Sequence, residues 1–424
     1  MRSNQQVIKK VMALVCTLIV MGAVQAGAGE ITFPLSAYTP EELQKVRAWE
    51  KTWAGKKIDK SNIDQVAEFM LDSFVGIYKD PQKWNAPPEG NYFQIVPYKQ
   101  ISPTPGEIES TNKYAPLVKT DAEGNVTNYA DIAGTPFPQP KNGYEVAYNV
   151  DCNSKGDDDH NRQKSPNINP RTKTDRLSDQ EYWNLSYIHR NDVEPRPALL
   201  KNKDGIQNAQ FMHMHMPPEM LNTRMITYRY FDPAKEDLQY LYYAQYRRIR
   251  RMSTSERENA IDGTDMIYDD ANQWDGHVSR NTYNLKGNKE LLCARNQDMS
   301  QLKRRTGQAI ADNWSLERCN LYQVEVKSKN PDYIYSKRMW YVDPETNYIA
   351  WQETWDQLGR YWKGFMLATQ ELKTVQGHTK ALHVGHIQQD FQRTHSGHSV
   401  INHKEIGKKI STKMYSLSSL QKTY

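Results

Sequence analysis

The stretch CNLYQVEVKSKNPDYIYSKRMWYVDPETNYIAWQETWDQLGRYWKGFMLAT, residues 319–369, decides the fold of this chain. Runs of β-branched and aromatic residues fill it, and turn-forming residues cut it at Pro331, Pro344 and Gly359. Connections this short join neighbouring strands that run antiparallel. The stretch therefore predicts a β-meander.

Aromatic side chains fall on both faces of the predicted strands. Tyr335 and Tyr341 share one face of the second strand and Trp340 lies on the other, while Trp351 and Trp355 share a face of the third. A sheet with one wet face would show clean polar alternation instead. The pattern fits a curved sheet around a partly hydrated groove. It fits equally well a β-sandwich core whose outer faces also carry aromatic side chains.

The N-terminus has the pattern of a cleaved secretory signal peptide, residues 1–26. Three basic residues precede an apolar run, residues 11–24, that is too short to span a bilayer, and Val24 and Ala26 supply the small residues of a cleavage site. Cleavage removes three basic residues and no acidic ones, which lowers the formal net charge from +5 to +2. We therefore expect an exported, periplasmic protein that is not a general polyanion binder.

Three cysteines remain in the mature chain: Cys152, Cys293 and Cys319. An odd number in an exported protein usually means one bridge and one spare thiol. Cys293 ends a predicted strand and Cys319 begins the meander. If these strands pair antiparallel, the two cysteines meet, so we predict a disulfide between Cys293 and Cys319.

Two helices are predicted near the N-terminus. Thr39, Pro40 and Glu42 form a capping box with proline at the first helical position, and this helix should end near Gly55. A second helix follows Ser61, because apolar residues recur there at helical spacing. These apolar residues are Ile63, Val66, Ala67, Met70, Leu71, Phe74, Val75 and Tyr78. The amphipathic helix should bury this face against the sheet.

Residues 152–175 are strongly polar and read as an exposed insertion. The run of aspartates at 157–159 resembles part of a calcium-binding loop. Lys155 occupies a ligand position of that pattern, however, and Arg162 stands where the bidentate glutamate belongs. A solvated loop is the favoured interpretation.

The sequence FMHMHM, residues 211–216, places His213 and His215 on one face of a predicted strand and methionines on the other. Histidine and methionine at this density form a copper-like ligand set. We favour an ordinary strand with a buried methionine face and a polar histidine face, and therefore predict no metal site. Copper binding through His213 and His215 is the alternative.

No motif of a known catalytic class is found in the sequence. It lacks the nucleophile elbow, the P-loop, the zinc-protease motif and the dinucleotide-binding fingerprint. No cofactor is expected. The sequence therefore favours a binding protein over an enzyme.

Four segments together resemble a known family. They are GTPFPQPKNGYEVAYN (134–149), YRRIRRMS with GTDMIYDDANQWDG (246–253 and 263–276), YNLKGNKELL (283–292) and YIYSKRMWYVDPETNYIAWQETWDQLGRYWK (333–363). Taken in this order, the four segments resemble those of domain-of-unknown-function family 1329. This is an exported Gram-negative family that is grouped with the outer-membrane lipoprotein-sorting fold. The resemblance implies a mainly β protein with some α structure, in which N-terminal helices plug a large, curved, unclosed antiparallel sheet. The long polar insertion departs from the family pattern.

The resemblance also implies a function, namely a periplasmic carrier for a hydrophobic or lipid-like ligand. It further implies a resistance-nodulation-division transporter and an outer-membrane barrel protein as partners. Residues 27–130 would form a helical and irregular segment that packs on the β domain, residues 131–424. A non-carrier adaptor is the alternative function. The residues expected to line the ligand groove are Trp340, Trp351, Trp355 and Trp362 with Met70 and Phe74.

Overall fold

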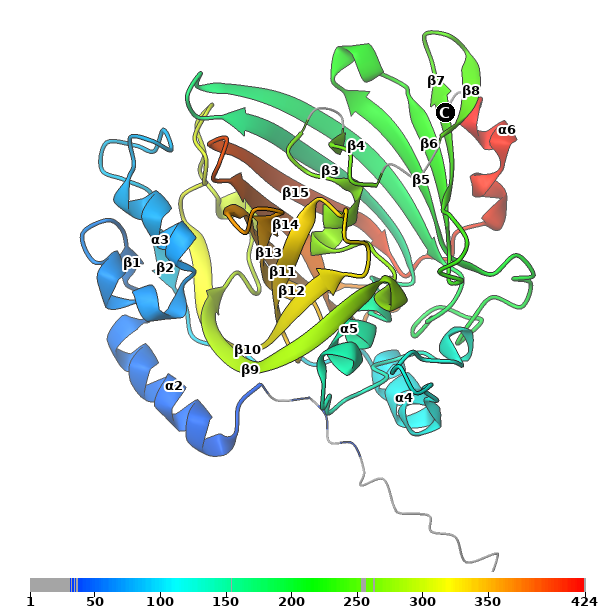
Figure 1. Ribbon diagram of the computed structural model, residues 1–424, viewed down its shortest axis with the longest axis horizontal. Helices are drawn as coiled ribbons and strands as arrows, with labels where there is room; N and C mark the ends of the chain where they lie inside the picture. Colours follow the sequence, from blue (N-terminus) through cyan, green and yellow to red (C-terminus); the bar gives the residue numbers. More distant parts are fainter. Residues whose placement is uncertain are drawn as a thin grey trace, which may run out of the picture. The chain divides into compact units, whose positions relative to one another are not determined.

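The chain divides into two compact units, Met1–Thr32 and Phe33–Tyr424. The computed structural model describes Ile31, Phe33, Leu35 and residues 37–153, 155–252, 257–261 and 264–422. The predicted signal peptide lies outside these residues. All that follows concerns the second unit (Figure 1).

Fifteen strands are found in the described part of the chain, and they form one sheet. In the first half of the chain they are β1 Lys57–Ile58, β2 Phe93–Ile95, β3 Asp158–Asn169, β4 Thr174–Ser186, β5 Ile206–Met216, β6 Arg224–Tyr230, β7 Leu238–Tyr243 and β8 Arg248–Met252. In the second half they are β9 Asn281–Cys293, β10 Trp314–Ser328, β11 Tyr335–Val342, β12 Ile349–Asp356, β13 Tyr361–Lys373, β14 Thr379–Asp390 and β15 His395–Ile406.

The sheet is unclosed and strongly curved (Figure 1). Its strand order is β1-β2-β10-β11-β12-β13-β14-β15-β3-β4-β5-β6-β7-β8, with β9 paired to β10 beside this path. The predicted meander is confirmed as β10 to β13, whose neighbouring strands pair antiparallel. Among the pairs of the described strands, β2 with β10 is parallel, so the sheet is mixed rather than wholly antiparallel.

The helices are α2 Pro40–Trp53, α3 Asp72–Lys79, α4 Pro105–Tyr114, α5 Gly143–Asp151 and α6 Leu417–Leu420. The capping box of α2 is present as predicted. The second predicted helix is shorter than expected, because two 3₁₀ turns at residues 63–65 and 67–69 precede α3. None of the helices in the described residues is long and apolar enough to cross a membrane.

Both faces of the meander are buried, which explains why its aromatic residues alternate without a polar face. Residues 58–84 pack on one face, where Trp351 and Tyr341 join a large apolar cluster. Helix α5 packs on the other face, where Trp340 and Ile349 join a second cluster. Ile349 and Trp351 do not share a face as simple alternation predicts, because the register shifts by one residue between them.

Strands β4 to β7 bury their outer face beneath the C-terminal segment. Phe211, Ile226 and Leu185 form an apolar cluster there with Tyr415 and Leu420. The Tyr415 hydroxyl also donates to the backbone carbonyl of Trp183 at 3.1 Å. The C-terminal segment thus covers part of the outer face, and the opposite face of these strands is left to form the site described below.

The disulfide predicted between Cys293 and Cys319 is absent from the structure, in which both cysteines are free thiols. Strands β9 and β10 do pair antiparallel, as that prediction required. Their register sets Cys319 opposite Leu291 and Cys293 opposite Glu317, so the two cysteines are diagonal neighbours. Their side chains nevertheless lie within hydrogen-bond contact of each other, and burial raises the pKa of the Cys319 thiol.

The exposed insertion predicted at residues 152–175 is also wrong. Most of it forms β3, which pairs with β15 on one side and β4 on the other. Asp158 and Asp159 are buried, and Asp158 forms an ion pair with the buried Arg190. The strand has no apolar alternation because one face lines a polar cavity and the other carries ion pairs such as Arg162 with Asp179.

Three buried carboxylates surround one guanidinium beside the meander. Arg295 lies 3.4 Å from Glu317, 3.3 Å from Asp343 and 2.5 Å from Glu345. One cation cannot compensate three anions in a desolvated site. Burial, with repulsion from Asp343 and Glu345, outweighs the attraction of Arg295 and raises the pKa of Glu317 to about 7.

This raised pKa predicts that the contribution of Glu317 to stability falls as the pH rises. The ordinary pKa of Glu317 is 4.5, so the folded protein holds this proton more tightly than the unfolded chain. The resulting stabilisation is complete below about pH 4.5 and disappears as the pH rises through about 7. We expect the contribution of Glu317 to the free energy of unfolding to fall by about 2 kcal/mol between pH 5.5 and pH 8. The buried neutral histidines contribute with the opposite sign over this range, so the contribution of Glu317 is measured as the difference between the parent protein and Glu317→Gln in urea denaturation.

Glu317→Gln should remove this contribution to the pH dependence, because glutamine cannot titrate. Glu325→Gln is the matched control, since Glu325 lies on the same strand but remains partly accessible. An unchanged pH profile in Glu317→Gln would contradict the assignment.

Candidate functional site

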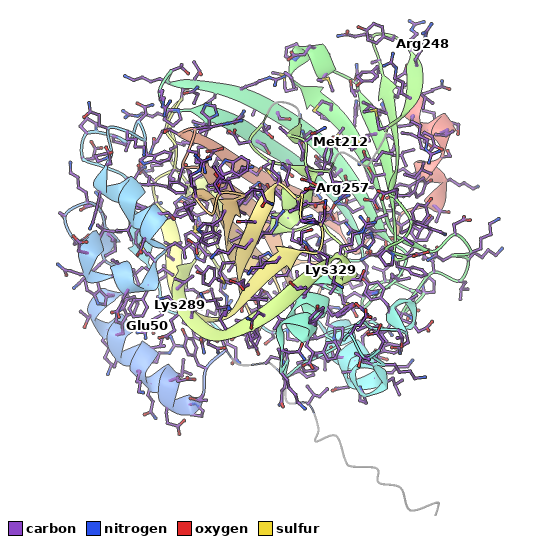
Figure 2. The ribbon with its side chains drawn as sticks, in the orientation of Figure 1. Glu50, Met212, Arg248, Arg257, Lys289 and Lys329 are labelled. Atoms are coloured by element: carbon purple, nitrogen blue, oxygen red, sulfur yellow. The ribbon has the colours of Figure 1, made fainter. Side chains whose placement is uncertain are left out.

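A partly open cavity of about 710 Å³ lies against the sheet. Its wall is one face of β14, β15 and β3 to β7. Further lining residues come from β8 and from the ranges 150–153, 155–157, 188–189, 217–220, 257–261, 264–275 and 347–349. Met212 and Arg257, both labelled in Figure 2, belong to this lining. The volume is within the range of about 300–1,000 Å³ that is typical of small-molecule sites.

An apolar row crosses one part of this wall. Met212 on β5 lies directly opposite Met225 on β6, which in turn lies opposite Leu241 on β7. All three side chains line the cavity. Met214 lines it two residues further along β5, because alternate residues of a strand share a face. Thioether side chains adapt their shape to varied apolar ligands.

The neighbouring part of the wall is polar and is built mainly from amide side chains. Gln163, Gln180, Asn184 and Gln210 line it on strands β3, β4 and β5. Hydrogen bonds link these amides to their neighbours along the wall: the amide of Gln210 donates to Asn184 at 2.9 Å, and that of Gln163 donates to Ser399 at 3.1 Å. Such bonds fix the side chains and leave further donors and acceptors facing the cavity.

Charged residues gather where Arg257 and Asp275 lie beside β6 and β7. Arg257 donates to Asp237 at 2.6 Å and to Asp275 at 2.9 Å, and Arg229 also pairs with Asp275. Burial opposes the charge of Arg229, but these two carboxylates outweigh it and raise the pKa of the guanidinium. Lys155 is accessible to solvent within this concave lining, and desolvation by the surrounding protein lowers its pKa.

Histidines from β14 and β15 complete the lining. Burial lowers the pKa of His386 to about 4 and that of His398 to about 3, so both rings are neutral near pH 7. His403 differs: burial opposes protonation, but a 2.7 Å bond to Asp159 outweighs it and raises the pKa. The Nε2 atom of His398 and the Nε2 atom of Gln388 are buried without a hydrogen-bond partner, so both offer polar contacts to a bound molecule.

The six residues predicted to line a ligand groove lie elsewhere. Trp340, Trp351, Met70 and Phe74 are buried in the two apolar clusters of the meander. Trp355 and Trp362 are half-buried: Trp355 packs against Tyr361, and Trp362 donates to Asp390 at 2.9 Å. None of the six belongs to the cavity lining. The segments that cover the meander fill both of its faces with side chains, and the wall of the cavity lies mainly on other strands of the sheet.

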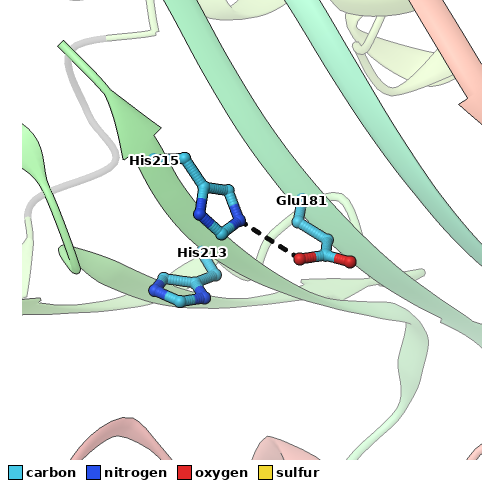
Figure 3. Close-up of side chains that lie close together, drawn as sticks. All are labelled: Glu181, His213 and His215. Atoms are coloured by element: carbon cyan, nitrogen blue, oxygen red, sulfur yellow. Dashed lines mark hydrogen bonds and ion pairs between the residues drawn. The ribbon is translucent and has the colours of Figure 1, made fainter. Parts of the chain in front are cut away.

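His213 and His215 point away from the cavity, since Met212 and Met214 occupy the cavity face of the same strand. The two imidazole rings lie side by side with centroids 4.5 Å apart. Glu181 on β4 lies beside them, and His215 Nε2 is 3.1 Å from its carboxylate (Figure 3). The structure thus separates the methionines from the histidines and adds a carboxylate to the histidine pair.

A family model described as "Protein of unknown function (DUF1329)" matches residues 57–421. The chain belongs to the DUF1329 family. The resemblance proposed from the sequence is therefore confirmed. An uncharacterised protein of Pseudomonas aeruginosa, PA3922, is 23% identical to this DUF1329 protein over 322 residues, which are 72% of this chain and 67% of the relative.

Two crystal structures are similar to this DUF1329 protein at low sequence identity. A DUF1329 family protein from Desulfovibrio piger is 15% identical with a TM-score of 0.48, and the match covers 66% of this chain and 98% of that one. A putative outer membrane lipoprotein-sorting protein domain from Vibrio parahaemolyticus is 12% identical with a TM-score of 0.45, and the coverage is the same.

The cavity of this DUF1329 protein was not predicted from the sequence, although the alternation of polar residues on two of its strands indicated part of it. Asn161 and Gln163 alternate along β3, and Gln180, Tyr182 and Asn184 alternate along β4. Polar side chains with a period of two predict strands with one solvent-facing side. The sequence does not reveal that these strands lie side by side with the methionine row. Together they form a surface that can hold apolar and polar parts of one molecule.

Proposed function

We propose that this protein is an exported carrier that binds an amphipathic, lipid-like molecule in the cavity. The observation that supports this proposal is the row of Met212, Met225 and Leu241 next to the amide wall on one continuous sheet face. The row would receive the apolar part of the ligand, where burial contributes about 25 cal/mol per Å² before binding costs. The amides and neutral histidines would hydrogen-bond its polar part.

The proposal favours binding over catalysis, because the lining combines broad apolar contact with many neutral hydrogen-bonding groups. The proposed partners are those expected from the family resemblance, namely a resistance-nodulation-division transporter and an outer-membrane barrel protein. These would deliver and receive the ligand.

The test compares two methionine substitutions. Met225→Lys should weaken binding of the apolar fluorescent probe N-phenyl-1-naphthylamine at least about tenfold, because it places a charge in the centre of the apolar row. Met339→Lys is the matched control: Met339 is a half-buried methionine on β11 outside the lining. Fluorescence titration of the purified proteins gives both affinities.

Mass spectrometry of an organic extract should also identify a lipid-like molecule released from the native parent protein. Equal probe affinity in the two variants would contradict the proposal, as would a parent protein that neither releases such a molecule nor takes up the probe.

A further inference from the structure

Three side chains on the outer face of β4 and β5 have the arrangement of metal ligands. Glu181 lies directly opposite His213 in the antiparallel register, and His215 follows two residues later on the same face. One ligand atom from each residue can be chosen so that all three lie within 4.8 Å of one another. Figure 3 shows the two rings and the carboxylate gathered beside the sheet.

The surroundings fix these groups without closing the site. Lys404 and His160 both contact the Oε1 atom of Glu181, whereas its Oε2 atom faces His215. The Nε2 atom of His213 lies 3.1 Å from the amide oxygen of Asn222, which orients that ring. The three candidate ligands are each partly exposed, so an ion from solution can reach them.

The protonation states of two of these groups also suit a metal ion. Burial lowers the pKa of His213, which keeps its imidazole neutral near pH 7. Burial works against the charge of Glu181, but hydrogen bonds from Lys404, His160 and His215 outweigh it and lower the pKa to about 2. Metal ions bind neutral imidazole and ionised carboxylate, so neither of these two groups must first lose a proton.

We propose that Glu181, His213 and His215 bind one divalent transition-metal ion on the outer face of the sheet. Imidazole ligands select copper or zinc over magnesium and calcium, and three protein ligands leave a coordination position for water. The hydrogen bond between His215 and Glu181 gives way to the ion, with the His215 proton held on Nδ1. The methionines take no part, since they line the cavity on the opposite face. The site is independent of the proposed carrier function.

Isothermal titration of the untagged, EDTA-treated full chain with CuCl₂ or ZnCl₂ tests this site. The parent protein should bind one ion per chain and should bind Cu²⁺ more tightly than Zn²⁺. His215→Ala should weaken binding at least about tenfold, and Glu181→Gln should do the same while keeping the size of the side chain. His378→Ala is the matched control: His378 is half-buried in the loop between β13 and β14 and lies outside the cluster.

Electron paramagnetic resonance of the copper-loaded protein gives a second readout. It should show two nitrogen ligands in the parent and in His378→Ala, but one in His215→Ala. The absence of stoichiometric binding in the parent would overturn the proposal. So would equal affinities in His215→Ala, Glu181→Gln and His378→Ala.

Discussion

Replacing Trp340 with alanine should lower the free energy of unfolding by about 3–5 kcal/mol, the usual cost of removing a large aromatic side chain from a packed core. Trp340 is 0% exposed. Its ring packs against Trp274 and Tyr283, with centroids 5.2 and 5.5 Å away. Its Nε1 atom donates to the buried Gln352 at 2.8 Å, so truncation also leaves an amide oxygen without its donor.

Trp355→Ala is the matched control for this measurement. Trp355 lies on the adjacent strand, but it is half-buried and contacts Lys337 and Tyr361 near the surface. We expect this substitution to cost less than about 2 kcal/mol by urea denaturation. Equal losses in the two variants would contradict the assignment of Trp340 to the core. If Trp340→Ala kept its stability but lost binding of N-phenyl-1-naphthylamine, the groove predicted from the sequence would be correct after all.

The sequence predicts the meander well because its turns are local. Proline or glycine at positions 331, 344 and 359 marks each reversal, and the structure places a strand on either side of each. The capping box of α2 is similarly local. Thr104 and Glu107 form the same motif at the start of α4 and could have predicted that helix. Signals contained within four residues need no knowledge of tertiary structure.

Burial and the site were harder to predict, because they depend on long-range pairing. Simple alternation cannot anticipate the register shift next to Ala350, which moves Ile349 to the other face from Trp351. Nor can it show that β3 pairs with β15 across more than 200 residues of sequence, which places polar β3 in the middle of the sheet. A tryptophan-rich ribbon has the same composition whether it lines a groove or fills a core.

Asp270→Asn should lower the free energy of unfolding by about 3–5 kcal/mol, because it leaves buried cations without their counterion. Asp270 is 1% exposed and accepts hydrogen bonds from Arg338 at 2.6 Å and from the Tyr335 hydroxyl at 2.7 Å. The ammonium group of Lys363, also buried, lies 3.9 Å away. Burial lowers the pKa of this lysine despite the attraction of Asp270, so the lysine is already poorly solvated.

The same substitution should also weaken ligand binding, because Asp270 anchors the segment that completes the cavity. In the sequence, Asp270 stands between residues that line the cavity: Met266 and Tyr268 precede it, and Trp274 follows it. We expect weaker binding of N-phenyl-1-naphthylamine together with the lower stability. Asp332→Asn, on an exposed turn between β10 and β11, should change neither quantity.

A double substitution separates the loss of charge from the loss of shape. Asp270→Asn leaves Arg338 and Lys363 without their counterion, and adding Arg338→Met removes one of these two cations. The double variant should therefore be more stable than the sum of the two single losses predicts. Urea denaturation of the four proteins in this cycle measures the coupling between Asp270 and Arg338. Strictly additive losses would show that the two charges stabilise the fold independently, and the anchoring role of Asp270 would then be wrong.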